Sequence, residues 1–348
     1  MRWTRAPDRT EAMMLAPSPL AFGVDTDMPD PSANGTPGAS LLSVERFTLR
    51  RRGVAVLDDV TLDLPRGQSL ALIGESGAGK STLAFAAMGL LRPPEVELEG
   101  ALHVGGTDIA TAPEKHLRTL RGSRMGLIFQ DATAALNPCF TVLQHLAEPL
   151  RRHRGLSRAA CRERAQALLE SVGIADPARR LDAYPHELSG GMQQRVMIAI
   201  ALACEPELLI ADEPTSALDV TIQAQIMTLI LERVRALGAS VIFVLHDLAL
   251  ATQVADRVAV MYAGQIVETG PAHDVLQSPR HPYTQGLRAS AIEFGAQRLH
   301  PIAGVVPPLS AMPQGCRYAP RCPQATAQCS QRPALSPRGE RLVACWHA

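Results

Sequence analysis

The sequence has no long hydrophobic run. The longest, Val196–Cys204, holds nine residues and stops at Glu205, whereas a membrane-spanning helix needs about 18 or more apolar residues. The apolar stretch between Ala12 and Val24 is interrupted by two prolines and is followed by no clean cleavage site, so it is not typical of a signal peptide. We therefore expect a cytoplasmic chain that does not cross the bilayer.

Neither sign of charge is in excess, because the 348 residues include 34 basic and 34 acidic side chains. This balance argues against a dedicated nucleic-acid-binding protein, which usually has a basic excess. Aromatic residues make up only 4%, but 46% of residues are hydrophobic, enough for one large domain with appendages or for two domains. Lysine is scarce, since only Lys80 and Lys115 occur and the other 32 basic residues are arginine. The position of a lysine is therefore informative.

Composition divides the chain. Residues 1–40 are predicted to be a disordered tail, because residues 28–40 are rich in proline, glycine and small polar residues. Residues 41–64 alternate apolar and polar side chains and predict strands, and residues 68–73 predict a buried strand that ends at Gly74. The pattern from residue 80 to residue 91 is helical.

Residues 140–205 are predicted to be mostly helical, with one helix from Ser157 to Val172 that Ser157 caps. Two short β-branched runs follow, Leu208–Ala211 and Val241–Leu245, and the helical pattern Val220–Leu237 joins them. This arrangement predicts a βαβ unit in a parallel sheet. After Gly270 prolines become frequent.

A glycine-rich segment matches the phosphate-loop pattern G-x-x-x-x-G-K-[ST]. It consists of Gly74, Glu75, Ser76, Gly77, Ala78, Gly79, Lys80 and Ser81, and Thr82 continues it. The glycines allow backbone N–H groups to face phosphate oxygens, and a helix that begins near Lys80 adds its positive end. Lys80 is expected to reach the β- and γ-phosphates and Ser81 to bind Mg²⁺. A plain glycine-rich turn is the alternative.

Two carboxylates follow the apolar run that begins at Leu208. Asp212, at the end of a parallel strand, is expected to hold Mg²⁺ directly or through water. Glu213 is expected to face the γ-phosphate and to polarise the attacking water. A strand that simply becomes polar at the surface would explain the pair if it stood alone, but not beside a phosphate loop.

Further motifs complete an ordered set. They are Gln130, the segment Leu188-Ser189-Gly190-Gly191-Met192-Gln193-Gln194-Arg195, the segment Ser216-Ala217-Leu218-Asp219, and His246. With the phosphate loop and Asp212-Glu213, the set strongly resembles the nucleotide-binding subunit of ATP-binding-cassette (ABC) transporters. The resemblance implies an α/β P-loop cassette over residues 41–270, with a RecA-like parallel sheet, an antiparallel β subdomain and a helical subdomain at about residues 131–195.

The resemblance also implies roles for single residues. Gln130 would touch Mg²⁺ and water and relay the nucleotide state to the helical subdomain. Ser189, Gly190 and Gly191 would face the γ-phosphate of ATP bound to a second ATPase subunit. Asp219 would lie at the dimer seam, and His246 would hydrogen-bond the γ-phosphate and hold Glu213.

Other segments narrow the resemblance to oligopeptide and dipeptide permease ATPases. They include Asp131–Pro138, Met192–Ala199, Ala217–Gln225, Met261–Gly264, His281–Leu287 and Gly315–Pro323. Residues 271–348 would then form the small cysteine-containing extension of that group. One departure concerns adenine, which the family often stacks on an aromatic residue after the first strand. Here that region reads Arg50-Arg51-Arg52, and the nearest aromatic residue is Phe47.

Four of the seven cysteines lie near the C-terminus, at Cys316, Cys322, Cys329 and Cys345. Disulfides are not expected in a reducing cytoplasm. The resemblance suggests a [4Fe–4S] cluster, and Zn²⁺ or unligated thiols are the alternatives. The isolated Cys139, Cys161 and Cys204 are expected to be small core residues.

The function that these inferences predict is ATP hydrolysis that drives an ABC importer of oligopeptides or dipeptides. The expected partners are a second ATPase subunit, two transmembrane permease subunits and an extracytoplasmic solute-binding protein, and no nucleic acid. The chain would be peripheral, on the cytoplasmic face of the membrane. An importer of nickel, glutathione or another small solute is one alternative. A non-transport ABC protein that acts on ribosomes or DNA is the other.

Overall fold

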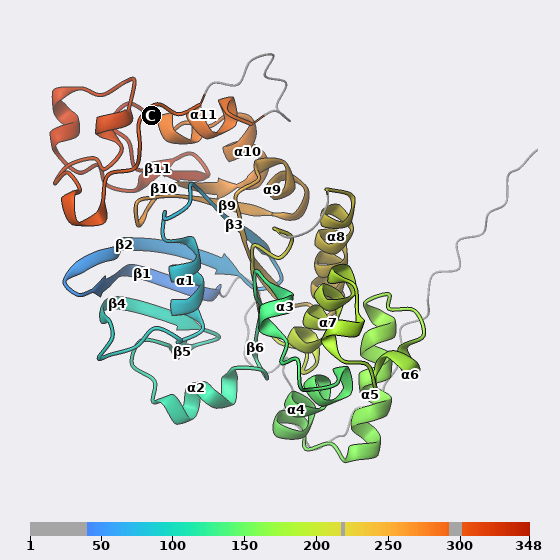
Figure 1. Cartoon of the computed structure of the whole chain (residues 1–348). Coiled ribbons are helices and arrows are strands. Elements are labelled where there is room, and N and C mark those ends of the chain that lie inside the picture. Colours follow the sequence, from blue (N-terminus) through green and yellow to red (C-terminus); the bar gives the residue numbers. More distant parts are fainter. Residues whose placement is uncertain (1–39, 217–219, 292–300) are drawn as a thin grey trace, which may run out of the picture. The chain divides into compact units, whose positions relative to one another are not determined.

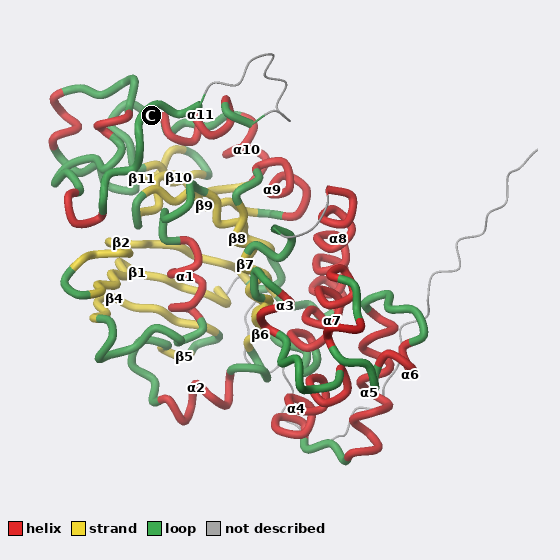
Figure 2. The backbone as a smooth tube through the Cα atoms, viewed as in Figure 1, coloured by secondary structure: helices red, strands yellow, loops and turns green. Residues whose placement is uncertain are grey.

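The computed structural model describes residues 40–216, 220–291 and 301–348. Within these residues the strands form two sheets, one of eight strands and one of four (Figures 1 and 2). Residues 1–39 of the predicted tail (residues 1–40) and the segment around Asp219 lie outside the described residues, whereas Ser40 begins a strand.

The larger sheet has the order β11-β12-β10-β9-β3-β8-β7-β6. From β9 to β6 neighbouring strands are parallel. The strands are β3 (Ser69–Ile73), β6 (Met125–Ile128), β7 (Leu208–Asp212), β8 (Ser240–Leu245), β9 (Arg257–Tyr262), β10 (Gln265–Pro271), β11 (Ser336–Arg338) and β12 (Arg341–Val343). Every residue of β3, β7 and β8 is buried, because helices or the second sheet cover both faces. The predicted buried strands are thus confirmed.

The smaller sheet is antiparallel, with the order β2-β1-β4-β5. Its strands are β1 (Ser40–Arg51), β2 (Val54–Pro65), β4 (Glu97–Val104) and β5 (Thr107–Asp108). Strand β2 alternates buried and more exposed residues from Leu57 to its end, as one-sided packing requires. Figure 1 shows helix α1 (Lys80–Ala87) beside this sheet.

A group of helices follows β6. It consists of α3 (Ala132–Ala135), α4 (Val142–Arg154), α5 (Arg158–Ser171), α6 (Pro177–Arg180), a 3-10 turn (Pro185–Glu187) and α7 (Gly190–Leu202). Side-chain caps begin several of them, because Thr141 and Gln144 form a capping box on α4 and Ser157 accepts the N–H of Ala160 on α5. The predicted cap at Ser157 is confirmed.

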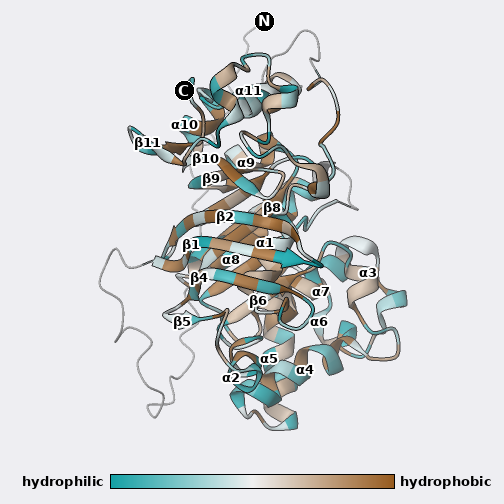
Figure 3. Ribbon diagram, turned by 90° about the vertical axis from the view of Figure 1, so that its left-hand side faces the viewer, coloured by the Kyte–Doolittle hydropathy of each residue, from teal (hydrophilic) through white to brown (hydrophobic). Residues whose placement is uncertain are grey.

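The remaining helices lie against the larger sheet or beside the antiparallel one. They are α2 (Glu114–Leu120), α8 (Val220–Ala236), α9 (Leu248–Val254), α10 (Ala272–Gln277) and α11 (Pro282–Ala289). Apolar side chains gather in two cores. One joins the two sheets through α1, and the other joins the larger sheet to α4, α5, α7 and α8. Figure 3 shows hydrophobic residues concentrated along the central strands.

The C-terminal residues extend the larger sheet. Strand β12 pairs with β10 through Glu268 and Thr269, and β11 pairs with β12. Three short 3-10 turns, Leu309–Ala311, Ala319–Arg321 and Ala327–Ser330, make up most of the other regular structure between α11 and β11 in the described residues. The sequence predicted a cysteine-containing extension here but not its pairing with the central sheet.

Candidate functional site

The glycine-rich segment forms a tight loop between β3 and α1. Gly74 has φ of 149°, and a Cβ there would lie 2.2 Å from the carbonyl oxygen of Met261. Gly79, at the N-cap of α1, has φ of 100°. Only glycine fits both positions, because an added side chain would meet backbone at Gly74 and L-residues rarely adopt these angles. The loop therefore keeps backbone at its surface, as a phosphate cradle needs.

Lys80 bends back over the loop. Its Nζ donates to the carbonyl oxygens of Gly74, at 2.7 Å, and Glu75, at 3.1 Å. Only 5% of the residue is exposed. Burial lowers the pKa of Lys80, while Glu213, Asp212 and Glu75 oppose the shift. The ammonium group is thus held by acceptors that leave it directed at the loop.

Ser81 and Asp212 meet across the strands. The Ser81 Oγ donates to Oδ1 of Asp212 at 2.8 Å, and Asp212 ends β7. Burial raises the pKa of Asp212, and the neighbouring Glu213 adds to the shift. Hydroxyl and carboxylate oxygens are the ligands that Mg²⁺ prefers, so the residues present fit this ion. Thr82 follows on the first turn of α1 and is half-buried.

Glu213, Gln130 and His246 come together beside this pair. Nε2 of Gln130 donates to Oε2 of Glu213 at 2.9 Å, and Nδ1 of His246 lies 3.9 Å from the same oxygen. Glu213 has φ of 43°, a left-handed conformation that is unfavourable for a residue with a side chain. Its N–H donates to the carbonyl of Val244 in β8 at 3.1 Å. The carboxylate of Glu213 thus lies between the amide of Gln130 and the imidazole of His246.

The segment Ser189-Gly190-Gly191 begins helix α7 (Figure 1). The Ser189 Oγ accepts the N–H of Met192 at 3.4 Å, and a Cβ on Gly190 would meet no atom within 4 Å. In the described part of the chain, no hydrogen bond joins these residues to the glycine-rich loop of the same chain. Ser189 and Gly190 therefore present an exposed helix N-terminus. The predicted Asp219 lies outside the described residues.

Two glutamines that sequence reasoning had given no role connect α7 to the other motifs. Gln193 accepts from the hydroxyl of Thr133 in α3 at 2.7 Å. Nε2 of Gln194 donates to the carbonyl of Pro214, directly after Glu213, at 2.6 Å. Both side chains are buried. Their only signal in the sequence was two adjacent amides, followed by Arg195, at the start of a largely apolar helix.

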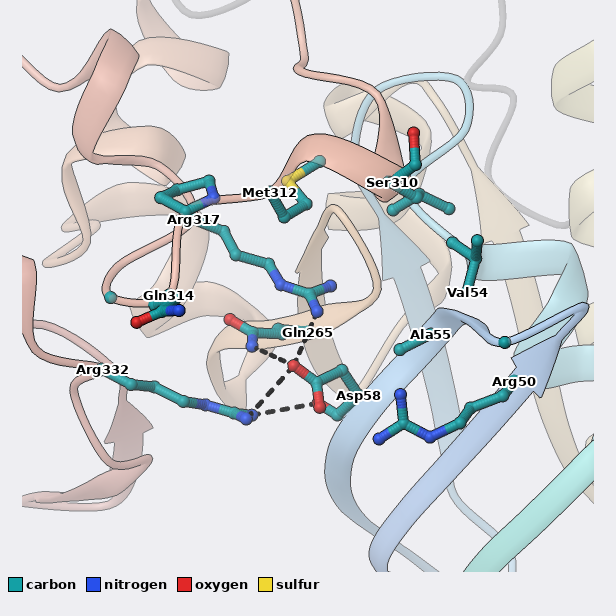
Figure 4. A pocket seen from close by; sticks show the side chains of 14 residues that line it. Arg50, Val54, Ala55, Asp58, Gln265, Ser310, Met312, Gln314, Arg317 and Arg332 are labelled. Carbon is teal, nitrogen blue, oxygen red and sulfur yellow. Dashed lines mark hydrogen bonds and ion pairs between the residues drawn. The ribbon is translucent and has the colours of Figure 1, made fainter.

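Phe47, the aromatic residue nearest to Arg50-Arg51-Arg52, is not placed to stack on adenine. Phe47 is fully buried in the core between the sheets, so its ring offers no face to a base. Arg50 lines a pocket of about 370 Å³ between the β1–β2 turn and the C-terminal residues (Figure 4). None of the glycine-rich loop residues lines this pocket.

The four C-terminal cysteines are free thiols, with Cys329 buried and the other three half-buried. The N–H of Cys316 donates to the carbonyl of Cys329 at 2.9 Å, and Sγ of Cys329 lies 3.8 Å from Nε2 of His347. Burial raises the pKa values of Cys316 and Cys322. Among the described residues, no three His, Cys, Asp or Glu side chains are placed to hold one metal ion. The described geometry therefore gives no support to the predicted metal cluster.

The isolated cysteines divide. Cys161 and Cys204 are buried, as expected. The expectation was wrong for Cys139, which is exposed because it lies in the loop between α3 and α4 rather than on a packed helix face.

Comparisons with known proteins agree with this geometry. Residues 57–216 match the family model described as ABC transporter, and residues 267–329 match the model described as oligopeptide/dipeptide transporter, C-terminal region. The dipeptide transport ATP-binding protein DppD of Haemophilus influenzae is 49% identical over 88% of this chain and 95% of its own length. DppD of Escherichia coli is 48% identical over 80% of this chain and 86% of its own length.

Solved structures agree as well. The dimeric post-hydrolysis structure of the ATP-binding cassette MJ0796, bound to ADP and Pi, has a TM-score of 0.59 and 29% identity, over 66% of this chain and 98% of that chain. The cbiO1 structure from Clostridium perfringens has a TM-score of 0.60 and 29% identity, over 69% and 91% of the two chains. No helix within the described ranges has the length and apolar character to span a membrane. The chain belongs to the ABC transporter ATPases, in the group that carries the oligopeptide/dipeptide transporter C-terminal region.

Proposed function

We propose that this ATPase energises an importer of oligopeptides or dipeptides and that it acts at the cytoplasmic face of the membrane. The identity of nearly half to DppD proteins, over most of both chains, supports this assignment. The observation that carries the chemistry is the cluster at the strand ends, where Ser81 meets Asp212 and Gln130 meets Glu213.

The proposed roles follow from the contacts. The loop N–H groups and Lys80 bind the phosphates, since the ammonium group is already directed at the loop. Ser81 and Asp212 hold Mg²⁺, which supplies charge neutralisation at the β- and γ-phosphate oxygens when bound. Glu213 accepts a hydrogen bond from the attacking water, and Gln130 and His246 hold the Glu213 carboxylate in place.

The dimer is part of the proposal. Ser189, Gly190 and Gly191 lie on α7, and their open helix end would meet the phosphates bound to a second ATPase subunit. Asp219 is proposed for the seam of that dimer. Two permease subunits and an external solute-binding protein would complete the importer. The links from Gln193 to Thr133 and from Gln194 to Pro214 would carry changes at Glu213 to the helical group.

Transport is tested in cells that lack the chromosomal copy. Uptake of a labelled dipeptide should return with the wild-type gene and fail with Lys80→Ala, because Lys80 is the proposed phosphate ligand. Lys115→Ala is the matched control, since Lys115 is the other lysine and is exposed on α2. Restored uptake of Ni²⁺ or glutathione without dipeptide uptake would overturn the peptide assignment.

A [4Fe–4S] cluster on Cys316, Cys322, Cys329 and Cys345 stays a prediction that rests on the sequence alone, because the matched C-terminal region ends at residue 329, before Cys345. Protein purified without oxygen should be brown and hold about four iron and four sulfide per chain. Colourless protein with one zinc would favour Zn²⁺, and metal-free protein whose four thiols alkylate freely would exclude both.

A further inference from the structure

Glu75, the second residue of the glycine-rich loop, is held by residues from the C-terminal part of the chain. Its N–H donates to the hydroxyl of Tyr283 at 2.8 Å. Its carboxylate accepts two hydrogen bonds from Arg321, at 2.6 and 3.0 Å. Its carbonyl accepts from Lys80. Every polar group of Glu75 is therefore engaged, and two of its partners, Tyr283 and Arg321, lie more than 200 positions away in the sequence.

Arg321 is itself fixed. Its side chain is 4% exposed, Nε donates to the carbonyl of Ala303 at 2.9 Å, and the guanidinium lies 5.7 Å from the ring centroid of Tyr262. A bidentate guanidinium–carboxylate pair has a fixed geometry and a low local dielectric strengthens it. The hydrogen bonds to Glu75 raise the pKa of Arg321, so the guanidinium stays charged.

Tyr283 is fixed from the other side. Its N–H donates to Nδ1 of His281 at 3.0 Å, at the N-terminus of α11. Burial lowers the pKa of His281 to about 3, so the imidazole stays neutral and keeps that acceptor. The ring of Tyr283 packs against Tyr262 and Tyr318, with centroids 4.7 and 5.3 Å away.

Arg317, four residues before Arg321, holds the turn between β9 and β10, and this turn contacts the glycine-rich loop. Arg317 donates to the carbonyl of Ala263 and, at 2.7 Å, to Asp58, as Figure 4 shows for Asp58. The next residue, Gly264, donates its N–H to the carbonyl of Ala78 in the glycine-rich loop at 2.8 Å. One C-terminal segment thus contacts the glycine-rich loop twice. Arg321 contacts it directly through Glu75, and Arg317 contacts it through the turn at Ala263 and Gly264.

We propose that Arg321 is a positioning residue of the ATPase reaction, which keeps the phosphate loop ordered and neutralises Glu75 beside the phosphates. The proposal rests on the proposed phosphate-binding role of this loop. Without Arg321 the loop would have to be ordered by the nucleotide, and ordering about one residue corresponds to roughly a tenfold loss in binding. An unpaired Glu75 carboxylate would also repel the phosphates. Both effects weaken the binding of MgATP and leave the rate of hydrolysis in the bound complex unchanged.

The test is Arg321→Gln in the full chain, with KM and kcat for MgATP measured in the assembled transporter. KM should rise about tenfold while kcat stays within about twofold, the signature of a lost binding contribution. A fall in kcat at unchanged KM would mean that Arg321 only maintains the folded fraction, and it would overturn the proposal. Arg321→Lys should give an intermediate KM, because one ammonium keeps the charge but not the bidentate geometry.

Two variants separate this inference from the site assignment. Arg338→Gln removes another guanidinium of the C-terminal residues, whose Nε donates to the carbonyl of Ala348 at 3.0 Å rather than to the glycine-rich loop or Asp58, and it should leave KM within about twofold. Lys80→Ala should weaken ATP binding strongly. Normal binding by Lys80→Ala would refute the site itself, whereas weak binding by Lys80→Ala with normal KM in Arg321→Gln would refute only the role of Arg321.

A double variant tests the electrostatic part. Glu75→Gln added to Arg321→Gln removes the unpaired carboxylate but does not restore the order of the loop, so KM should fall below that of Arg321→Gln and stay above that of wild type. If KM stays as high as in Arg321→Gln alone, repulsion by Glu75 makes no contribution and that half of the proposal is wrong.

Discussion

At the residue scale, the conformation of Glu213 is as telling as its partners. A left-handed glutamate persists only where its surroundings over-determine it, and here the Val244 carbonyl and the Gln130 amide do so. Glu213→Gln should retain ATP binding and lower turnover by about 10²–10⁴-fold, as for loss of a general base. Phosphate release by the assembled transporter measures this effect.

Glu205 provides the matched control for Glu213. It is also a glutamate with positive φ, of 53°, but it is exposed and pairs with Arg164 at 2.6 Å. Glu205→Gln should change turnover by less than about twofold, because exposed ion pairs contribute little. Equal losses in the two variants would show that the loss of turnover is not specific to the carboxylate at the strand end.

Asp212 should make stability depend on pH. Burial raises its folded pKa above the unfolded value, so the stabilising neutral form is fully present below the unfolded pKa and is lost as pH rises through the folded pKa. Asp212→Asn should therefore raise the Tm of nucleotide-free protein by about 2 °C or more at pH 8, and the gain should vanish near pH 4. Added MgATP should stabilise wild type but not the variant. A constant Tm difference across this pH range would contradict the assignment.

At the element scale, helix α7 is buried along most of its length, but its first residues, Ser189 and Gly190, are exposed in the part of the chain that the structure describes. Gly190→Asp places bulk and negative charge at the open helix end, and the site is sterically free within the chain. The variant should bind ATP as a monomer and fail to associate with a second subunit in MgATP, as sedimentation in a Glu213→Gln background would show. Gly190→Ala is the control and should still associate. Loss of ATP binding by the Gly190→Asp monomer would exclude a site shared between subunits.

Elements built from local signals could be predicted from the sequence. The strands β3, β7 and β8 are continuous apolar runs, and Ser157 caps α5 through its own backbone neighbours. Ser81 and Asp212 could be paired in advance because parallel strands end at the same edge of a sheet.

Elements that depend on distant partners could not be predicted. Strands β11 and β12 have three residues each and become strands only by pairing, β12 with β10 and β11 with β12. Arg321 and Glu75 are 246 positions apart, and no sequence motif near either residue predicts that the two form an ion pair. The exposure of Cys139 likewise depends on the path of a loop, which the periodicity of apolar residues does not predict.

At the scale of the whole described structure, the C-terminal extension is joined to the catalytic core at buried charges. Glu268 of β10 is fully buried and accepts the N–H groups of Arg280 and His281, both at 3.0 Å, and Arg341 of β12 lies 3.5 Å from it. Burial leaves this carboxylate dependent on those partners.

Removal of residues 301–348 should therefore destabilise the remaining core. It takes away Arg341 and Arg321 and leaves Glu268 with one charged partner fewer, and breaking one buried pair costs about 3–5 kcal/mol. The Tm should fall by about 6 °C or more, as calorimetry would measure. An unchanged Tm would show that the extension is energetically independent of the cassette.

The pairing of β12 with β10 also determines which strand forms the edge of the larger sheet, where unpaired backbone groups could bind another chain. Without β12, the seven-residue strand β10 would present a row of unpaired N–H and C=O groups, which is a template for aggregation. With it, the sheet ends instead at β11, a three-residue strand that contains Pro337 and is followed by a turn between Arg338 and Arg341. Short, proline-containing and charged edges discourage strand addition. A subunit that must meet a second ATPase face to face is thereby protected from joining one edge to edge.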